Sequence, residues 1–475
     1  MDNETKAGVI GNTPRLSLAS MFGYGLGNFS LGMSSNLFNF YFIFFATTVA
    51  GINPAFAGTI SFIAILWDAI SDPIIGSMSD NSTNKYGRRR PFLIAGILPL
   101  VLSMILLFTK VDFGGFTNMY YIIAAIAFWT SYTIYGVPYS ALGAELTVDF
   151  KKRNTLNLVM LLFTLLSLFV VSTFTVQIAE TVASKGYSIE RGWFVAAILF
   201  GIVSLIAGFT CWISTKGREK DYTVDRSKNV NIVKTYVSIF NIKSLRILCI
   251  GFLLYAVGFT IVTGNQIFLL TNNLGLKGPD IGKFFLINAI LGALLIPVVG
   301  LIADKLGKRK AYIGVILTAS LGQILFAFIG LKSFTFMIIL GVLQSLCNNT
   351  FFSLSMSMNF DCCQIDEFVS GKSREGALLT VTSLFQKFGY AVGGWIMGIL
   401  LQFSGFVGSL EVQSPETIKG LLRISTVYAP AFFIVSTLVV SLYKMNEEKF
   451  KALRAAIELK KEGKEYSTEI FKDIL

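Results

Sequence analysis

The loop at residues 300–310 reads GLIADKLGKRK, with Asp304 between two glycines and basic residues after the second glycine. The loop at residues 76–90 reads GSMSDNSTNKYGRRR and gives Asp80 the same setting over a longer stretch. Glycine permits a tight turn and a close approach of two helices. Each loop follows the second apolar run of its half of the chain. The two loops share the same order of glycine, aspartate, glycine and basic residues, and this order therefore indicates an internal duplication.

The composition is that of a membrane protein. Of the 475 residues, 53% are hydrophobic and 14% are charged, and the mean hydropathy is +0.65. A soluble chain carries about 25% charged residues, and about 20 apolar residues span a bilayer as a helix. We predict an all-α polytopic protein with twelve transmembrane helices, near residues 17–48, 54–79, 91–109, 119–144, 155–180, 192–214, 244–272, 280–303, 311–331, 335–359, 376–403 and 428–445.

The longest polar break divides these spans six and six. The predicted organisation is an N-terminal half (1–214), a cytoplasmic central loop (215–243), a C-terminal half (244–445) and a cytoplasmic tail (446–475). The tail mixes charges with apolar residues, which is typical of an amphipathic helix on a membrane surface or of a solvated helix.

The net charge of +12 reflects topology. Lys and Arg concentrate in alternate loops and in both tails, as the positive-inside rule requires of cytoplasmic segments. We expect a multi-pass protein of the cytoplasmic membrane with both termini inside, a lipid bilayer around it and no nucleic-acid partner. The polar first 16 residues lack the apolar core of a cleavable signal peptide.

Several kinds of chemistry find no support in the sequence. The five cysteines suggest no disulfide framework, there is no histidine, and no G-x-x-x-x-G-K-[ST] motif points to ATP. No constellation of nucleophile, base or metal ligands indicates a membrane enzyme. We expect no metal centre and no cofactor beyond a co-transported proton or sodium ion.

Two acids lie inside the second apolar run, ILWDAISDPIIG at residues 65–76. Each aspartate in mid-membrane costs about 2.5–3.5 kcal/mol, and the four-residue spacing places Asp68 and Asp72 on one helix face. Two carboxylates so close do not both stay ionised without a cation. Pro73 leaves the Ala69 carbonyl without its donor. The pair predicts a cation or proton site, or alternatively an acid pair bonded to a basic partner for packing.

One basic residue, Lys387, lies deep in the eleventh span. We predict that it neutralises an aspartate or binds substrate hydroxyls; snorkelling to an interface is the alternative. Charged residues at the cytoplasmic ends of the spans are predicted gate residues, and in loops they are equally typical of solvated side chains. The predicted gate residues are Asp80, Arg88, Asp149, Arg153, Asp304, Arg309, Asp361 and Arg374, with Lys152 and Glu367 as alternative partners.

The duplicated loop resembles the signature loop of the major facilitator superfamily. Three segments resemble the glycoside–pentoside–hexuronide:cation symporters more specifically: WDAISDPIIGSMSDNSTNKYGRRRPFLIAG, YGVPYSALGAELTVDFKKRNTL and FDCCQIDEFVSGKSREGALLTVTSLFQKFGYAVGG. The resemblance covers most of the chain. It implies sugar uptake coupled to sodium, proton or lithium entry by alternating access.

The resemblance also assigns residues. It implies that Asp68 and Asp72 form the cation site, with Ser71 and Thr133 beside it, and that Lys387 is linked to both substrate and cation.

Three departures alter the sugar site, because Gly32, Gly136 and Ser140 stand where a family member has two acids and a tryptophan. The absence of an acid at position 136 slightly favours a proton over sodium as the coupling ion. The remaining candidates for sugar contacts are Asn28, Asn36, Asn39, Tyr139, Asn265, Gln266, Asn348 and Asn349. Each is equally typical of polar contacts between helices.

The sequence therefore predicts a monomeric transporter that couples cation entry to uptake of a sugar or glycoside. A sugar exchanger or uniporter and a non-sugar carrier of the same superfamily are the alternatives.

Overall fold

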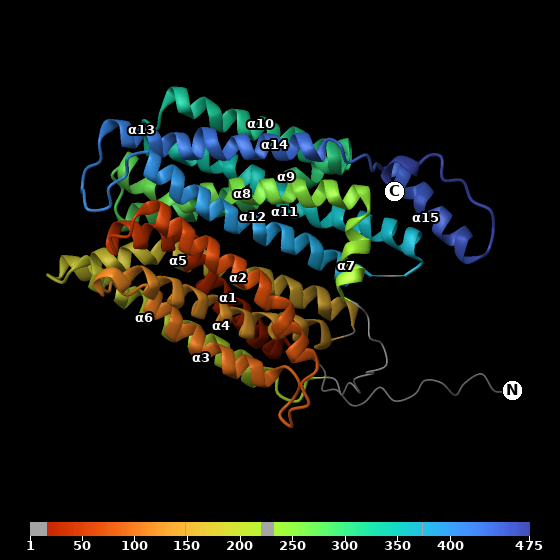
Figure 1. The fold of residues 1–475 in the computed structure, drawn as a ribbon, viewed down its shortest axis with the longest axis horizontal. Helices are drawn as coiled ribbons and strands as arrows, with labels where there is room; N and C mark the ends of the chain where they lie inside the picture. Colours follow the sequence, from red (N-terminus) through yellow and green to blue (C-terminus); the bar gives the residue numbers. More distant parts are fainter. Residues whose placement is uncertain (1–16, 148, 220–231, 373) are drawn as a thin grey trace. The chain divides into compact units, whose positions relative to one another are not determined.

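The computed structural model describes residues 17–147, 149–219, 232–372 and 374–475, and these are helical with short connections (Figure 1). The first six long helices are α1 (Leu18–Phe44), α2 (Pro54–Asp80), α3 (Arg90–Leu107), α4 (Thr117–Glu145), α5 (Phe150–Ser184) and α6 (Ile189–Ser214). The next five are α8 (Lys243–Phe268), α9 (Gly278–Leu306), α10 (Lys308–Ile329), α11 (Phe334–Ser370) and α12 (Glu375–Phe403). The last is continuous through α13 (Pro415–Arg423), the π-helical η4 (Ile424–Tyr428) and α14 (Ala429–Val440).

The twelve predicted spans are confirmed as helices. Eleven of the described helices are long and apolar enough to cross a membrane. The remaining one, α1, has 27 residues and no charge, but its glycine, serine and asparagine residues lower its mean hydropathy.

Two predicted spans have different limits in the structure. The twelfth begins at Pro415 rather than near 428, because its first turns are amphipathic and carry the charged Glu416, Lys419 and Arg423. Helix α11 continues past 359 to Ser370, since its acidic last turns are still helical. Hydropathy alone misses both polar extensions.

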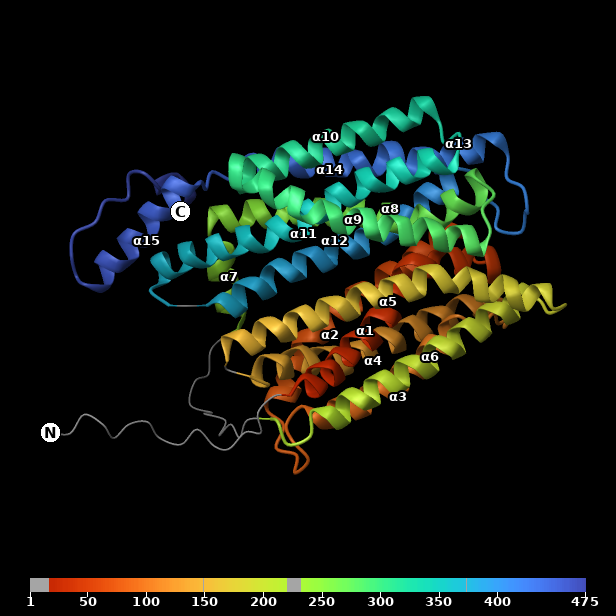
Figure 2. The same ribbon diagram turned by 180° about the vertical axis from the view of Figure 1, so that it is seen from behind.

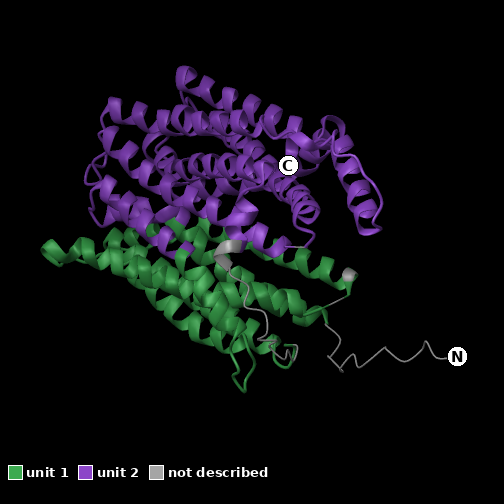
Figure 3. Ribbon diagram, turned by 45° about the vertical axis from the view of Figure 1, so that its right-hand side comes forward, with its two compact units in different colours: residues 1–38, 70–225 green, residues 39–69, 226–475 purple. Residues whose placement is uncertain are grey.

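The chain divides into two compact units, drawn in different colours in Figure 3: residues 1–38 with 70–225, and residues 39–69 with 226–475. The end of α1 and the first half of α2 thus group with the C-terminal helices. Much of the predicted central loop lies outside the described residues, and the short α7 (Ile232–Phe240) occupies its end. The division into sequence halves stays a prediction.

Close helix contacts organise each unit. In the first unit α3 packs on α4 and α6, and a Cβ at Gly96 of α3 would lie 2.7 Å from the backbone nitrogen of Tyr135 in α4. In the second unit α8 packs between α12 and α14, and α11 contacts both α9 and α10, which Figures 1 and 2 show from opposite sides.

The second unit also contains a repeated helix ending. Helices α1 and α8 each finish in a π-helical turn, η1 (Phe45–Val49) and η3 (Leu269–Asn273). Gly51 and Gly275 follow with positive φ values of 73° and 62°. The Ile52 amide donates to the Ala46 carbonyl at 2.8 Å, and the Leu276 amide donates to the Leu270 carbonyl at 2.9 Å. This is a second trace of the internal duplication.

The tail forms a helix, α15 (Glu447–Lys461), that packs on α11. Leu453, Ala456 and Ile457 are buried on its inner face. The Lys460 ammonium donates to the Phe368 carbonyl at 2.6 Å. The tail is therefore amphipathic as predicted, but its apolar face contacts protein.

Candidate functional site

Helix α2 carries both predicted cation-site acids. It continues without a break from Pro54 to Asp80, with Pro73 inside it. Asp68 is 2% exposed, and Asp72, one turn further along the same helix, is half-buried. The two carboxylates are thus presented from one helix face, as the spacing predicts.

Asp68 has a basic partner within its own unit. The Lys387 ammonium of α12 donates to Asp68 Oδ2 at 2.5 Å. Removing one member of a buried pair leaves an uncompensated charge, at a cost of about 3–5 kcal/mol. One of the two roles predicted for Lys387, neutralising an aspartate, is therefore present in the structure.

Two hydroxyls that the resemblance assigns to the cation site lie together in the other unit. The Ser71 hydroxyl of α2 donates to Thr133 Oγ1 of α4 at 3.2 Å, and both residues are buried. Hydroxyl and carboxylate oxygens are ligands of the type that hard cations prefer. Their part in cation binding stays a prediction.

The predicted sugar ligands of the first unit contact neighbouring helices. Asn28 donates to the Met160 carbonyl at 2.9 Å. Asn36 donates to Ser167 Oγ at 3.4 Å. The Tyr139 hydroxyl donates to the Tyr24 carbonyl at 3.0 Å, and the two rings stack.

Those of the second unit do the same. Asn348 accepts a bond from the Tyr255 hydroxyl at 2.8 Å, and Asn349 donates to the Gly292 carbonyl at 2.7 Å. Asn265 donates to the Leu421 carbonyl at 2.8 Å. These bonds join helices, and roles in sugar binding stay predictions. Asn348 and Asn349 are half-buried, whereas Asn265 is fully buried.

The loop after α2 forms a charged cluster with α4. Arg88 pairs with Glu145 at the end of α4. Arg89 contacts Asp80 at 2.8 Å and Glu145 at 3.3 Å. Glu219, which follows α6, accepts the backbone amides of Arg89 and Arg90, both at 2.8 Å, and so satisfies two donors at the start of α3. Sequence reasoning missed Glu145 and Glu219, because a lone glutamate after a span has no distinguishing pattern.

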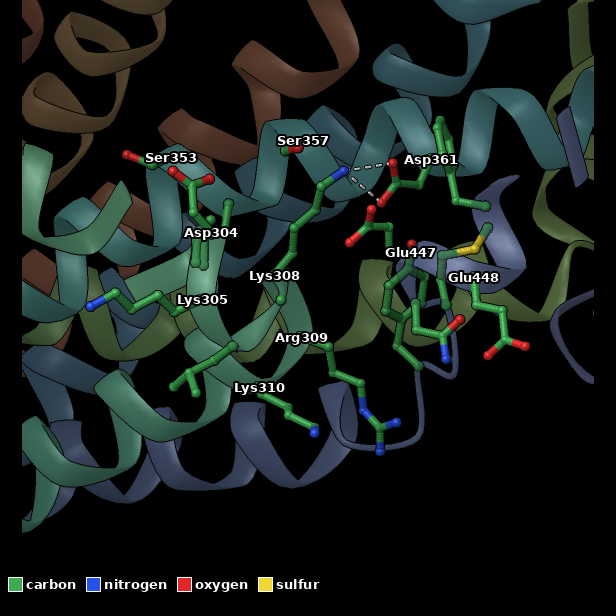
Figure 4. A pocket seen from close by; sticks show the side chains of 18 of the residues that line it. Asp304, Lys305, Lys308, Arg309, Lys310, Ser353, Ser357, Asp361, Glu447 and Glu448 are labelled. Carbon is green, nitrogen blue, oxygen red and sulfur yellow. Dashed lines mark hydrogen bonds and ion pairs between the residues drawn. The ribbon is translucent and has the colours of Figure 1, made fainter. Parts of the chain in front are cut away.

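The duplicated loop forms a comparable cluster in the second unit. Lys308 contacts both carboxylate oxygens of Asp361 at 2.7 and 3.0 Å, and Arg309 donates to the Ser441 carbonyl. Figure 4 shows Lys308 extended toward Asp361, with Glu447 of the tail nearby. A cavity of about 910 Å³ lies here between the α9–α10 turn, α11 and the tail, and Asp304 is in its lining.

The remaining gate candidates have local partners. Arg374 donates to both carboxylate oxygens of Asp366, rather than to Asp361 or Glu367, because the chain turns at Gly371 and brings it back over the last turn of α11. This bonding raises the pKa of Arg374 above its ordinary value. Asp149 caps α5 by accepting the amides of Lys151 and Lys152.

In α5, the Arg153 backbone amide donates to the Asp149 carbonyl at 2.9 Å. Glu367 pairs with Lys461 of the tail at 2.7 Å. The gating roles of all these residues stay predictions.

Twelve membrane helices with a repeated helix ending, an ion pair on a buried aspartate and charged clusters at the helix ends are typical of a membrane transporter built from an internal duplication. The chain belongs to the MFS/sugar transport protein family, whose model matches residues 23–447.

Curated relatives match the chain over nearly its whole length. An uncharacterized symporter, YnaJ, of Bacillus subtilis (strain 168) is 27% identical over 94% of this chain and 96% of its own. A putative glycoside/cation symporter, YagG, of Escherichia coli (strain K12) is 24% identical over 92% and 94%. The isoprimeverose transporter of Lactiplantibacillus pentosus is 25% identical over 91% and 90%.

Solved structures support the fold. A bacterial homologue of the human lysosomal transporter Spinster matches with a TM-score of 0.66 at 14% identity, covering 90% of this chain and 98% of that one. A nucleoside transporter, NupG, matches with a TM-score of 0.64 at 11% identity, covering 90% and 100%. The twelve-helix fold of the superfamily is thus confirmed, and the family is one of transporters rather than enzymes.

Proposed function

We propose that this protein is a secondary transporter that couples entry of a proton or sodium ion to uptake of a sugar or glycoside by alternating access. The observation that carries the proposal is the ion pair between the buried Asp68 and the half-buried Lys387, one helical turn from Asp72. The names of the relatives, among them a glycoside/cation symporter and an isoprimeverose transporter, support the substrate class.

The ion pair suggests how the coupling works. A cation or proton at Asp68 and Asp72 competes with Lys387 for the same carboxylate. Once displaced, the Lys387 ammonium is available to substrate hydroxyls. Cation and sugar then favour each other's binding, and by linkage the effect is reciprocal.

The setting follows from the same proposal. The protein acts as a monomer in the cytoplasmic membrane, with both termini inside. It needs no cofactor other than the co-transported cation. The charged clusters at Arg88–Glu145 and Lys308–Asp361 belong to the inner gate.

The test is uptake of a panel of labelled glycosides into energised vesicles, with pH and sodium gradients imposed separately. We expect one gradient to drive accumulation by the wild type, whereas Asp72→Asn only equilibrates the substrate. Asp112→Asn, an exposed loop acid, is the matched control and retains accumulation. Equilibration by the wild type under every gradient would instead indicate a uniporter or exchanger. Transport of no sugar at all would indicate a non-sugar carrier.

A further inference from the structure

The charged ends of the helices repeat one set of contacts in both units. The first basic residue after the second glycine of each duplicated loop pairs with an acid of the fourth helix in its set of six. Arg88 pairs with Glu145 at the end of α4, and Lys308 pairs with Asp361 near the end of α11. The internal duplication therefore extends from the loops to their ion-pair partners.

A second repeated contact joins each loop to the last helix of its set. Arg90 donates to the Trp212 carbonyl near the end of α6 at 2.9 Å. Arg309 donates to the Ser441 carbonyl at the end of α14. Basic groups are favourable at this end of a helix, where carbonyls lack helical partners. Trp212 and Ser441 therefore hold corresponding places in the two units.

This correspondence gives Glu448 a counterpart in the first unit. Glu219 lies seven residues after Trp212, and Glu448 lies seven residues after Ser441. The Glu219 carboxylate accepts two backbone amides at the start of α3, both at 2.8 Å. Glu448 thus follows the last helix of its set at the position from which Glu219 caps α3.

The start of α10 lacks this cap in the present structure. Helix α10 begins after Gly307, which has no side chain to offer. Among the described residues, no side chain accepts the backbone amides of residues 308–310, and Ala311 is the first to donate back, to the Gly307 carbonyl at 3.0 Å. Unpaired amides and the helix dipole make such a helix start attractive to a carboxylate.

Glu448 lies across a cavity from this helix start. The cavity of about 910 Å³ is lined by residues 307–310 and by residues 446–448, and Figure 4 shows Glu448 apart from Lys310. The buried side chains of α15 begin only at Leu453. The first turn of α15 therefore has room to move toward α10 while the rest of its buried face stays packed.

We propose that Glu448 is a reversible cap of α10. The start of the tail exchanges between the position described here and one in which the Glu448 carboxylate accepts the first amides of α10, as Glu219 does for α3. The capped position brings a second carboxylate beside Lys308, which is now bound to Asp361. The position of the tail therefore changes the ion pair that joins α10 to α11.

The test measures hydrogen exchange of the backbone amides of residues 308–310 in the full chain. We expect Glu448→Ala to raise their exchange rates about threefold or more, the change for a cap that is in place about two thirds of the time. Glu447→Ala is the matched control, because Glu447 lines the same cavity but pairs with Lys451 inside α15 at 2.7 Å. It should leave exchange unchanged. Both glutamates are exposed, so neither substitution disturbs the core.

A second measurement follows the movement itself. Spin labels are placed at the exposed positions Leu321 of α10 and Lys451 of α15, in a background where the five native cysteines are changed to serine or alanine. We expect two label separations by double electron–electron resonance when Glu448 is present, and only the longer one in Glu448→Ala.

Any one of three results would overturn the cap. These are unchanged exchange in Glu448→Ala, an equal rise of exchange in Glu447→Ala, which would reflect the charge of the tail alone, and label separations that do not respond to Glu448→Ala. Neither measurement requires a substrate. The cap is therefore tested independently of the proposed sugar transport.

Discussion

At the scale of single residues, the buried carboxylate of Asp68 requires a positively charged partner from a neighbouring helix. A charge in the bilayer is stable only when it is paired or reaches water. The register of α12 places Lys387 opposite Asp68, with the ammonium 2.5 Å from Oδ2. In the proposed function, the residues that stabilise this charge are therefore also the ones that couple cation to substrate.

The first prediction separates these two roles. Lys387→Met removes the ammonium that contacts Asp68 Oδ2 and should lower the free energy of unfolding by about 3–5 kcal/mol. The double variant Asp68→Asn, Lys387→Met removes both charges and should regain most of that loss, yet it should still fail to accumulate substrate. Thermal unfolding in detergent and gradient-driven uptake check the two parts. If the double variant were as unstable as Lys387→Met alone, the unpaired charge of Asp68 would not be the cause of the lost stability.

A second residue-scale prediction concerns Glu219. Its carboxylate accepts two backbone amides at the start of α3, and hydrogen bonds of charged groups are worth about 1.5–3 kcal/mol. Glu219→Ala should lower stability by about that amount, and Glu219→Gln, which keeps an acceptor, by less. The exposed Glu462→Ala in the tail is the control. Equal melting temperatures for Glu219→Ala and wild type would contradict this role.

At the scale of elements, the tail acts as a packed part of the second unit. Beyond α15 the chain returns to the start of α8, where Ser244 donates to the Ile474 carbonyl at 2.6 Å. Phe471 is buried beside Phe368 of α11, with ring centroids 5.3 Å apart. The tail thus connects α11 to α8 at their charged ends.

The third prediction is the pH dependence of this attachment. Hydrogen bonding by Lys449 holds the pKa of Asp473 below its ordinary value of 3.8. The Asp473 carboxylate therefore contributes fully to the attachment of the tail above about pH 4. This contribution is lost as the pH falls through the lowered pKa. Hydrogen exchange of residues 464–475 should rise in that acidic range. Asp473→Asn should show the faster exchange already at neutral pH, whereas an exchange rate independent of pH in the wild type would contradict the prediction.

At the scale of the whole molecule, the sequence predicts the helices and the charged centre well. Hydropathy and the duplicated loop predict the twelve spans, and the cost of buried charge singles out Asp68 and Lys387. The amphipathic start at Pro415 was missed because hydropathy averages over polar turns. Glu145 and Asp366 were missed because pairing depends on distances between segments far apart in the chain or across a turn, which no local pattern contains.

The last prediction tests the topology that follows from twelve spans. An even number of crossings places the loop after α2 and the C-terminal tail on the same side, while the loops after α3 and α12 lie on the other. Single cysteines at Lys85 and Lys464 should react with an impermeant maleimide only in inside-out vesicles, and those at Gly115 and Val412 only in right-side-out vesicles; all four positions are exposed. If the polar α13 prevented the last helix from crossing, the cysteine at position 464 would react from the outside while that at position 85 would not. The measurement therefore decides whether the segment from Pro415 to Val440 completes the second set of six spans.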